Sequence, residues 1–211
     1  MAMLDFRNRV SAMMPPQSHV GIVLAAGGSR RLGFAKQLLR VQGRSLIARS
    51  TEFLIGTGAR RVLVILGAEA ARMQQELAEL QVSILINYDW QTGLAGTLRL
   101  AADAVATIGG ADCLLTGVDQ PLLDQLHLQQ LLEASRTYPG HDIVTGYGGV
   151  RGTPVLLRGQ TLALARTIVG DRGLQQVLKD RKTHVVVNER LVEDLDTPEA
   201  VERARLMGWI D

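Results

Sequence analysis

The stretch VGIVLAAGGSRRLGFAK, residues 20–36, decides the fold. It begins with a continuous apolar run, which is typical of a strand buried on both faces of a parallel sheet. Glycines and cationic side chains follow without a break. A buried strand that runs directly into a glycine-rich turn indicates an α/β protein with a ligand site at the carboxyl end of that strand.

Further apolar runs repeat this order of short strand and longer helical stretch. They predict strands at residues 61–66, 82–86, 112–116, 142–145 and 184–187. Between several of them apolar residues recur at helical spacing, and a last helix is predicted over residues 198–206. The expected fold is a three-layer α/β/α sandwich with a doubly wound, mostly parallel sheet. The apolar piece at residues 155–157 is expected to elaborate on this sheet.

The composition limits the classes of protein to which the chain can belong. With 211 residues, 46% of them hydrophobic, we expect one domain over residues 19–211, after an N-terminal extension, residues 1–18, that need not be ordered. A net charge of +2 argues against nucleic acid as a partner. No apolar run approaches the roughly 20 residues that span a membrane, and no signal peptide is recognisable. The lone Cys113 excludes an internal disulfide, so we expect a soluble, cytoplasmic protein.

The turn after the first strand has the composition of a phosphate-binding loop. Its glycines at 27, 28 and 33 let backbone amides approach a ligand closely, and Arg30 and Lys36 add positive charge. The spacing matches neither the Walker motif, which needs Gly-Lys-Ser/Thr in succession, nor Gly-x-Gly-x-x-Gly. The alternative is a tight turn with solvated arginines.

Two acidic turns are candidates for a metal site. Asp119 lies just after the predicted strand at 112–116, and Mg²⁺ prefers carboxylate oxygen together with substrate phosphates. Asp196 precedes Thr197 and Pro198, so it either caps the last helix or completes the metal site. An ordinary turn aspartate before proline is the alternative for Asp119. The four histidines lack the spacing of a zinc motif.

These residues together indicate attack of an incoming phosphate on the α-phosphorus of a nucleotide. No general base is needed, because the attacking phosphate is already anionic at neutral pH. Catalysis then depends on alignment and on neutralising charge, for which Lys36, Arg30, the loop amides and a metal at Asp119 are adequate. The loop at residues 87–97 also follows a strand and could shape the pocket.

The motifs resemble those of the MobA-like NTP transferases, and within them the molybdenum cofactor cytidylyltransferase branch. The resemblance covers about residues 20–205. It implies that the expected sandwich is of the nucleotide-diphospho-sugar transferase type and that residues 19–211 form a single nucleotidyltransferase domain. Residues 24–36 look like the nucleotide-binding signature of that family. Residues 118–121 look like its Gly-Asp-Gln-Pro metal motif, and residues 196–199 like its C-terminal Asp-Thr-Pro-Glu.

The resemblance implies a role for each matching residue. Catalysis is expected from Lys36, Arg30 and Asp119, with Mg²⁺ held by Asp119 and Asp196. The acceptor is expected to contact Arg151, Asp171 and Arg172. The residues expected to bind the nucleotide are Leu24, Ala25, Ala26, Gly27, Gly28, Ser29, Arg30, Gly33, Lys36, Asp89 and Gly93.

The reaction implied is transfer of CMP from CTP to molybdopterin–molybdate, with release of pyrophosphate. A molybdenum hydroxylase or its maturation chaperone is the implied protein partner. Ala26 stands where the guanylyl branch usually has glycine, which favours CTP, whereas Val118 and residues 93–98 depart from the family pattern. The alternatives within the same chemistry are GTP or another nucleotide as the donor, or another acceptor. A dinucleotide-binding oxidoreductase or a non-catalytic nucleotide-binding module is the alternative of another class.

Overall fold

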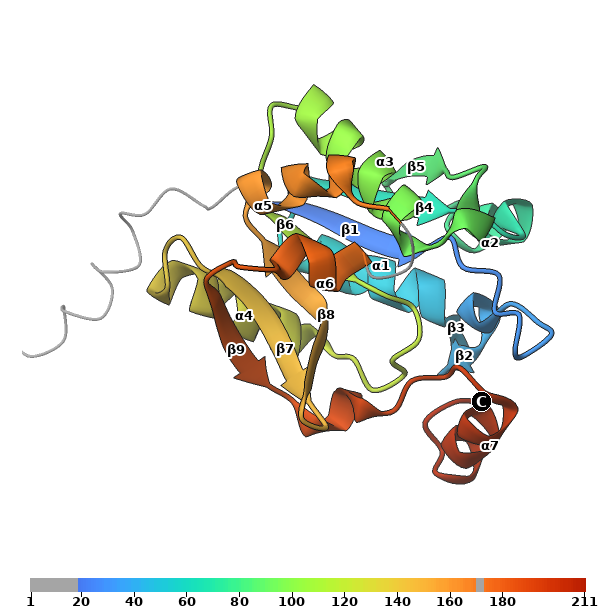
Figure 1. The fold of residues 1–211 in the computed structure, drawn as a ribbon. Coiled ribbons are helices and arrows are strands. Elements are labelled where there is room, and N and C mark those ends of the chain that lie inside the picture. Colours follow the sequence, from blue (N-terminus) through green and yellow to red (C-terminus); the bar gives the residue numbers. More distant parts are fainter. Residues whose placement is uncertain (1–18, 170–172) are drawn as a thin grey trace, which may run out of the picture.

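A computed structural model describes residues 19–169 and 173–211 of the chain (Figure 1). The predicted N-terminal extension and the predicted acceptor residues Asp171 and Arg172 lie outside these ranges. No helix within them is long and apolar enough to cross a membrane. The strands are β1 (Val20–Ala25), β2 (Arg40–Val41), β3 (Arg44–Ser45), β4 (Arg61–Leu66), β5 (Ser83–Ile86), β6 (Cys113–Thr116), β7 (Asp142–Tyr147), β8 (Val150–Leu157) and β9 (Thr183–Val187). The helices are α1 (Leu46–Gly56), α2 (Ala70–Glu76), α3 (Leu94–Thr107), α4 (Gln125–Thr137), α5 (Gly159–Ala163), α6 (Gly173–Leu178) and α7 (Pro198–Leu206).

The described residues form a 7-stranded sheet with the strand order β5-β4-β1-β6-β8-β7-β9 (Figure 1). Neighbouring strands are parallel except where β8 lies antiparallel to both β6 and β7. From β1 the chain winds outward through β4 and β5, and then returns to place β6 on the other side of β1. The predicted doubly wound, mostly parallel sheet is confirmed. Its direction of winding reverses between β1 and β6, which is where ligands bind in such sheets.

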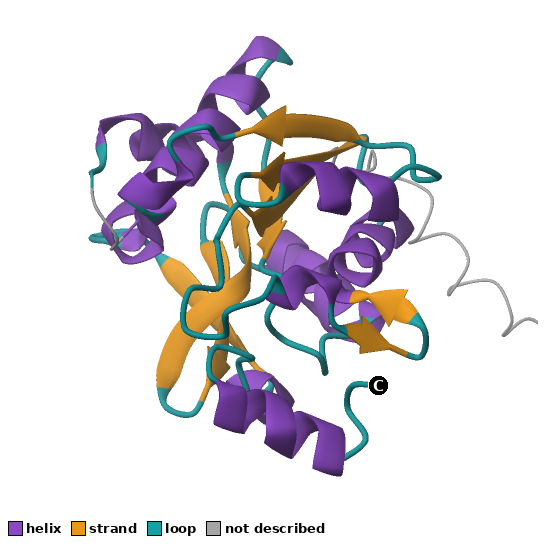
Figure 2. Ribbon diagram, turned by 90° about the vertical axis from the view of Figure 1, so that its right-hand side faces the viewer, coloured by secondary structure: helices purple, strands orange, loops and turns teal. Residues whose placement is uncertain are grey.

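Helices cover both faces of this sheet, which gives the predicted three layers (Figure 2). Successive side chains of β1 point to opposite faces, so Val23 joins one core and Ile22 the other. The Val23 core is covered by α1, α2 and α4, and the Ile22 core by α3, α5 and α6. The helical residues in these cores include Ile47, Met73 and Leu128 on the first face, and Leu98, Leu162 and Val177 on the second.

The predicted elaboration at residues 155–157 is part of a full strand inside the sheet. Gly148 and Gly149 have φ values of +53° and +76° and join β7 to β8 as a two-residue hairpin loop. Such loops need left-handed backbone, which glycine adopts without steric cost. The chain therefore reverses after β7, and β8 inserts between β7 and β6 instead of lying on the sheet.

Arg158 fixes the end of β8 to the neighbouring loops. Its buried guanidinium group donates hydrogen bonds to the Asp112 carboxylate at 2.6 Å and to the backbone oxygens of His141, Ser135 and Tyr138 at 2.8–3.2 Å. This cluster lies at the amino end of β6 and β7, and so at the opposite edge of the sheet from the winding reversal. It stabilises the scaffold on which the site is built.

We expect Arg158→Met to lower the free energy of unfolding by about 3–5 kcal/mol, because it removes the buried donor of these four hydrogen bonds and the ion pair with the partly buried Asp112 carboxylate. Urea denaturation followed by circular dichroism measures this change. The matched control is Arg166→Met, which removes an exposed ion pair with Asp103 and should cost at most about 1 kcal/mol. Equal losses in the two variants would contradict a special role for Arg158.

Candidate functional site

The turn after β1 is held in shape by Gln37, which is buried although it lies in a polar loop. Its side-chain nitrogen donates to the backbone oxygen of Gly27 at 2.6 Å and to that of Ala25 at 3.3 Å. Ser29 has a φ of +47°, and its hydroxyl accepts from the backbone nitrogen of Lys36 at 3.3 Å. The two ends of the turn are therefore tied together.

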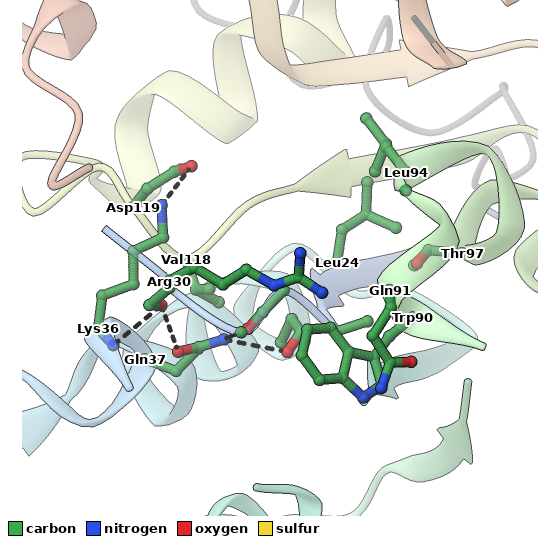
Figure 3. A pocket seen from close by; sticks show the side chains of 16 residues that line it. Leu24, Arg30, Lys36, Gln37, Trp90, Gln91, Leu94, Thr97, Val118 and Asp119 are labelled. Atoms are coloured by element: carbon green, nitrogen blue, oxygen red, sulfur yellow. Dashed lines mark hydrogen bonds and ion pairs between the residues drawn. The ribbon is translucent and has the colours of Figure 1, made fainter. Parts of the chain in front are cut away.

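Trp90 packs against this turn from the loop between β5 and α3 (Figure 3). A Cβ atom on Gly28 would lie 2.5 Å from the indole ring, and one on Gly67 would lie 2.5 Å from the backbone oxygen of Ala26 and 2.7 Å from Trp90. Both positions therefore need glycine. The Arg30 guanidinium carbon lies 5.5 Å from the ring centroid, within cation–π range. Trp90 therefore packs along one side of the turn and contacts the Arg30 guanidinium group.

Lys36 connects the turn to two carboxylates from distant parts of the chain. Its Nζ lies 3.2 Å from Oδ2 of Asp119, after β6, and forms a second ion pair with Asp196, before α7 (Figure 3 shows the Asp119 contact). Burial favours the neutral amine, but the two carboxylates outweigh it and raise the pKa of Lys36. The lysine is a firmly charged ammonium group between two anions.

The helix cap of α7 is Thr197 and not Asp196. The Thr197 hydroxyl accepts from the backbone nitrogen of Ala200 at 3.2 Å, and Pro198 occupies the first turn, where no amide hydrogen is required. Asp196 is therefore free of the capping role that the sequence left open. Its carboxylate faces Lys36.

Asp194 is a third carboxyl group near this pair, and the sequence interpretation missed it. Burial, followed by the negative charges of Asp119 and Asp196, raises the pKa of Asp194 to about 7. The contribution of the two neighbouring carboxylates indicates that negative charge is concentrated around Asp119 and Asp196. Among the described residues, however, no group of three or more His, Cys, Asp or Glu side chains could hold a metal ion.

A cavity of about 420 Å³ opens between the turn after β1, the start of α3 and the turn after β6 (Figure 3). The predicted site residues that line it are Leu24, Ala25, Ala26, Gly27, Gly28, Ser29, Arg30, Lys36, Gly93 and Asp119. Trp90, Gln91, Leu94 and Thr97 also line it, and they belong to the loop at residues 87–97 that the sequence suggested could shape the pocket. Val118 of the predicted metal motif lines it too, as does Gln37, which the sequence did not single out. Asp196 lines an adjoining hollow together with Ser29, Arg30 and Lys36.

The other predicted residues do not line this cavity. Gly33 has a φ of +73° and shapes the turn. Asp89 uses its backbone nitrogen to donate to Asn87 and leads into the turn before α3. Arg151 is exposed in β8, and its guanidinium group donates to the hydroxyl of Thr183, the first residue of β9, at 3.2 Å. Their predicted roles in ligand binding stay predictions.

The chain is similar in sequence and in fold to known proteins. A family model described as MobA-like NTP transferase domain matches residues 21–186. Nicotine blue oxidoreductase of Paenarthrobacter nicotinovorans is 32% identical over 87% of this chain and 94% of its own length. A probable molybdenum cofactor guanylyltransferase of Rhodopirellula baltica is 32% identical over 63% of this chain and 64% of its own. The crystal structure of Rv0371c from Mycobacterium tuberculosis H37Rv has a TM-score of 0.76 at 23% identity, covering 90% of this chain and 98% of that one.

Proposed function

Since the chain belongs to the MobA-like NTP transferase family and is a nucleotidyltransferase, we propose that it transfers CMP from CTP to molybdopterin–molybdate. The products are the cytosine dinucleotide of molybdopterin, for use by a molybdenum hydroxylase, and pyrophosphate. The observation that carries the proposal is the Lys36 ammonium group, which meets two carboxylates from distant turns beside a cavity lined by glycines. A triphosphate and a cation could be bound side by side there.

The reaction requires positive charge beside the reacting phosphates and needs no general base. An oxygen of the acceptor phosphate attacks the α-phosphorus of the nucleotide, the bond from that phosphorus to the bridging oxygen breaks, and pyrophosphate leaves with the electron pair. Arg30 and Lys36 lie on the turn that would hold the triphosphate, where they offset the charge that grows on the leaving group. Backbone amides of the same turn add donors to phosphate oxygens.

Asp119 and Asp196 are the residues that would hold a divalent cation. Their carboxylate oxygens are hard donors, and the lysine between them shows that the pair stabilises positive charge. Two carboxylates leave room for phosphate oxygens and water in the coordination of Mg²⁺, which commonly binds in this way. When bound, the ion would act as a Lewis acid that polarises the phosphate oxygens.

The choice of CTP depends on Ala26. This residue lines the cavity and stands where the guanylyl branch usually has glycine, so the preference for CTP over GTP follows from that resemblance. The guanylyltransferase of Rhodopirellula baltica makes GTP the alternative substrate with the same chemistry.

A second candidate function is oxidation or reduction with a bound dinucleotide. It is favoured by the 32% identity to nicotine blue oxidoreductase, which extends over 94% of that protein. A dinucleotide site usually needs an acid near the end of the second strand of the sheet, to bind the ribose. Here the chain after β4 reads Gly67-Ala68-Glu69, but the Glu69 carboxylate pairs with Arg72 and does not line the cavity, and the Trp90 side chain packs against Gly67. The geometry therefore supports the transferase better.

A thermal-shift experiment separates the two functions. We expect CTP with Mg²⁺, at about 100 times its dissociation constant, to raise the melting temperature by about 5–10 °C, because a ligand of the folded state stabilises it by about 2.7 kcal/mol. GTP, ATP and NADH, each with and without Mg²⁺, are the comparisons. A larger shift with GTP would support the same transfer reaction with GTP in place of CTP as the nucleotide. A shift with NADH alone would overturn the transferase proposal.

A further inference from the structure

Gln120 lies next to Asp119 and reaches the segment that carries Asp196. Its side chain is buried, and its nitrogen donates to the backbone oxygen of Leu191 at 2.9 Å. One residue earlier, the backbone oxygen of Asp119 accepts from the nitrogen of Leu195 at 3.0 Å. The turn after β6 and the segment before α7 are therefore joined by two hydrogen bonds, one on either side of Asp194.

Buried leucines anchor the segment before α7, but they do not fix its orientation. Leu191 belongs to the core under α1, α2 and α4, whereas Leu195 belongs to a separate small cluster with Val201 of α7. Hydrophobic contacts are not directional, so two buried leucines anchor the segment without fixing its rotation. Hydrogen bonds to specific carbonyls supply that direction. Gln120 makes one of the two.

We propose that Gln120 is a positioning residue, which by holding the Leu191 carbonyl sets the separation between the Asp119 and Asp196 carboxylates and thereby their affinity for a divalent cation. This inference rests on the proposed function, in which those two carboxylates hold the ion. Gln120 does not line the nucleotide cavity. Its effect should appear in cation binding and in kcat, and not in the affinity for the nucleotide.

The test is titration of the full-length protein with Mn²⁺ alone, with the free ion measured by electron paramagnetic resonance. Gln120→Met keeps the size of the side chain and removes the donor, and should raise the Mn²⁺ dissociation constant about tenfold, as loss of a group that orients a metal ligand typically does. In steady-state assays kcat should fall while KM for CTP stays within about twofold. Unchanged Mn²⁺ affinity in a folded Gln120→Met protein would overturn the proposal.

The matched control is Thr161→Val, which removes another buried side-chain hydrogen bond, from Thr161 to the Asp142 carboxylate at 2.9 Å. Thr161 lies at the amino edge of the sheet, so the Thr161→Val variant should be less stable but should bind Mn²⁺ with unchanged affinity. If both variants weaken Mn²⁺ binding equally, Gln120 is merely structural. Gln120→Asn, which keeps the amide but shortens its reach, should weaken binding in the same direction and serves if the methionine variant does not fold.

Failure of this inference and failure of the proposed function give different results. A wild-type protein that binds no Mn²⁺ and releases no pyrophosphate from any nucleotide would reject the proposed function itself. A wild-type protein that does both, with a Gln120→Met variant of equal Mn²⁺ affinity, would reject only the role of Gln120.

Discussion

Asp119→Asn is expected to lower the rate of pyrophosphate release from CTP by about 10³-fold, because it removes the charge that would hold the divalent cation at the reacting phosphates. Asparagine has nearly the same shape, and the backbone oxygen of Asp119 keeps its hydrogen bond from Leu195. The fold should therefore stay intact. A coupled pyrophosphate assay at saturating CTP measures the rate, and circular dichroism checks the fold.

The control for this variant is Asp103→Asn, which removes an exposed carboxylate of α3 that pairs with Arg166. It should leave the rate unchanged. Turnover of Asp119→Asn near that of the wild type would show that Asp119 is not needed for cation binding. Added Mg²⁺ should recover part of the lost rate if weaker binding is the cause of the defect.

Most of the sheet could be predicted because its strands are buried on both faces. A run such as Arg61–Leu66 reads as continuous apolar sequence, and the helical spacing that follows it separates it from the next strand. β8 could not be predicted as an inserted strand. Its first half, Val150 to Thr153, is exposed or half-buried, and its position depends on a two-glycine reversal after β7 that local spacing does not reveal.

The sequence could also predict which turns would meet, but not how they are packed. The turns with Lys36 and Asp119 follow β1 and β6, and the carboxyl ends of adjacent parallel strands lie at one edge of the sheet. Gly28 lines the cavity and also makes room for the Trp90 side chain, a contact that the sequence does not reveal. Asp194 looks like an ordinary acid in an acidic segment, because its burial comes from tertiary contacts.

Lys36→Met is expected to slow pyrophosphate release from CTP and to raise the affinity for a divalent cation. Pyrophosphate release from CTP should fall by about 10²–10³-fold, because the ammonium group that would offset charge on the triphosphate is lost. Without nucleotide, however, the Asp119 and Asp196 carboxylates lose the cation that now lies between them. Their affinity for Mn²⁺ should then rise about tenfold, since two close carboxylates without a counter-charge attract a divalent ion more strongly.

The measurement is the same Mn²⁺ titration without nucleotide, combined with the pyrophosphate assay. Lys36→Arg is the matched control, because it keeps the positive charge and should leave Mn²⁺ affinity close to that of the wild type even if its activity is low. Mn²⁺ affinity that falls or stays constant in Lys36→Met would show that the lysine does not compete for the cation position. Affinity that rises together with lost turnover would mean that Lys36 occupies that position until a divalent cation and nucleotide bind.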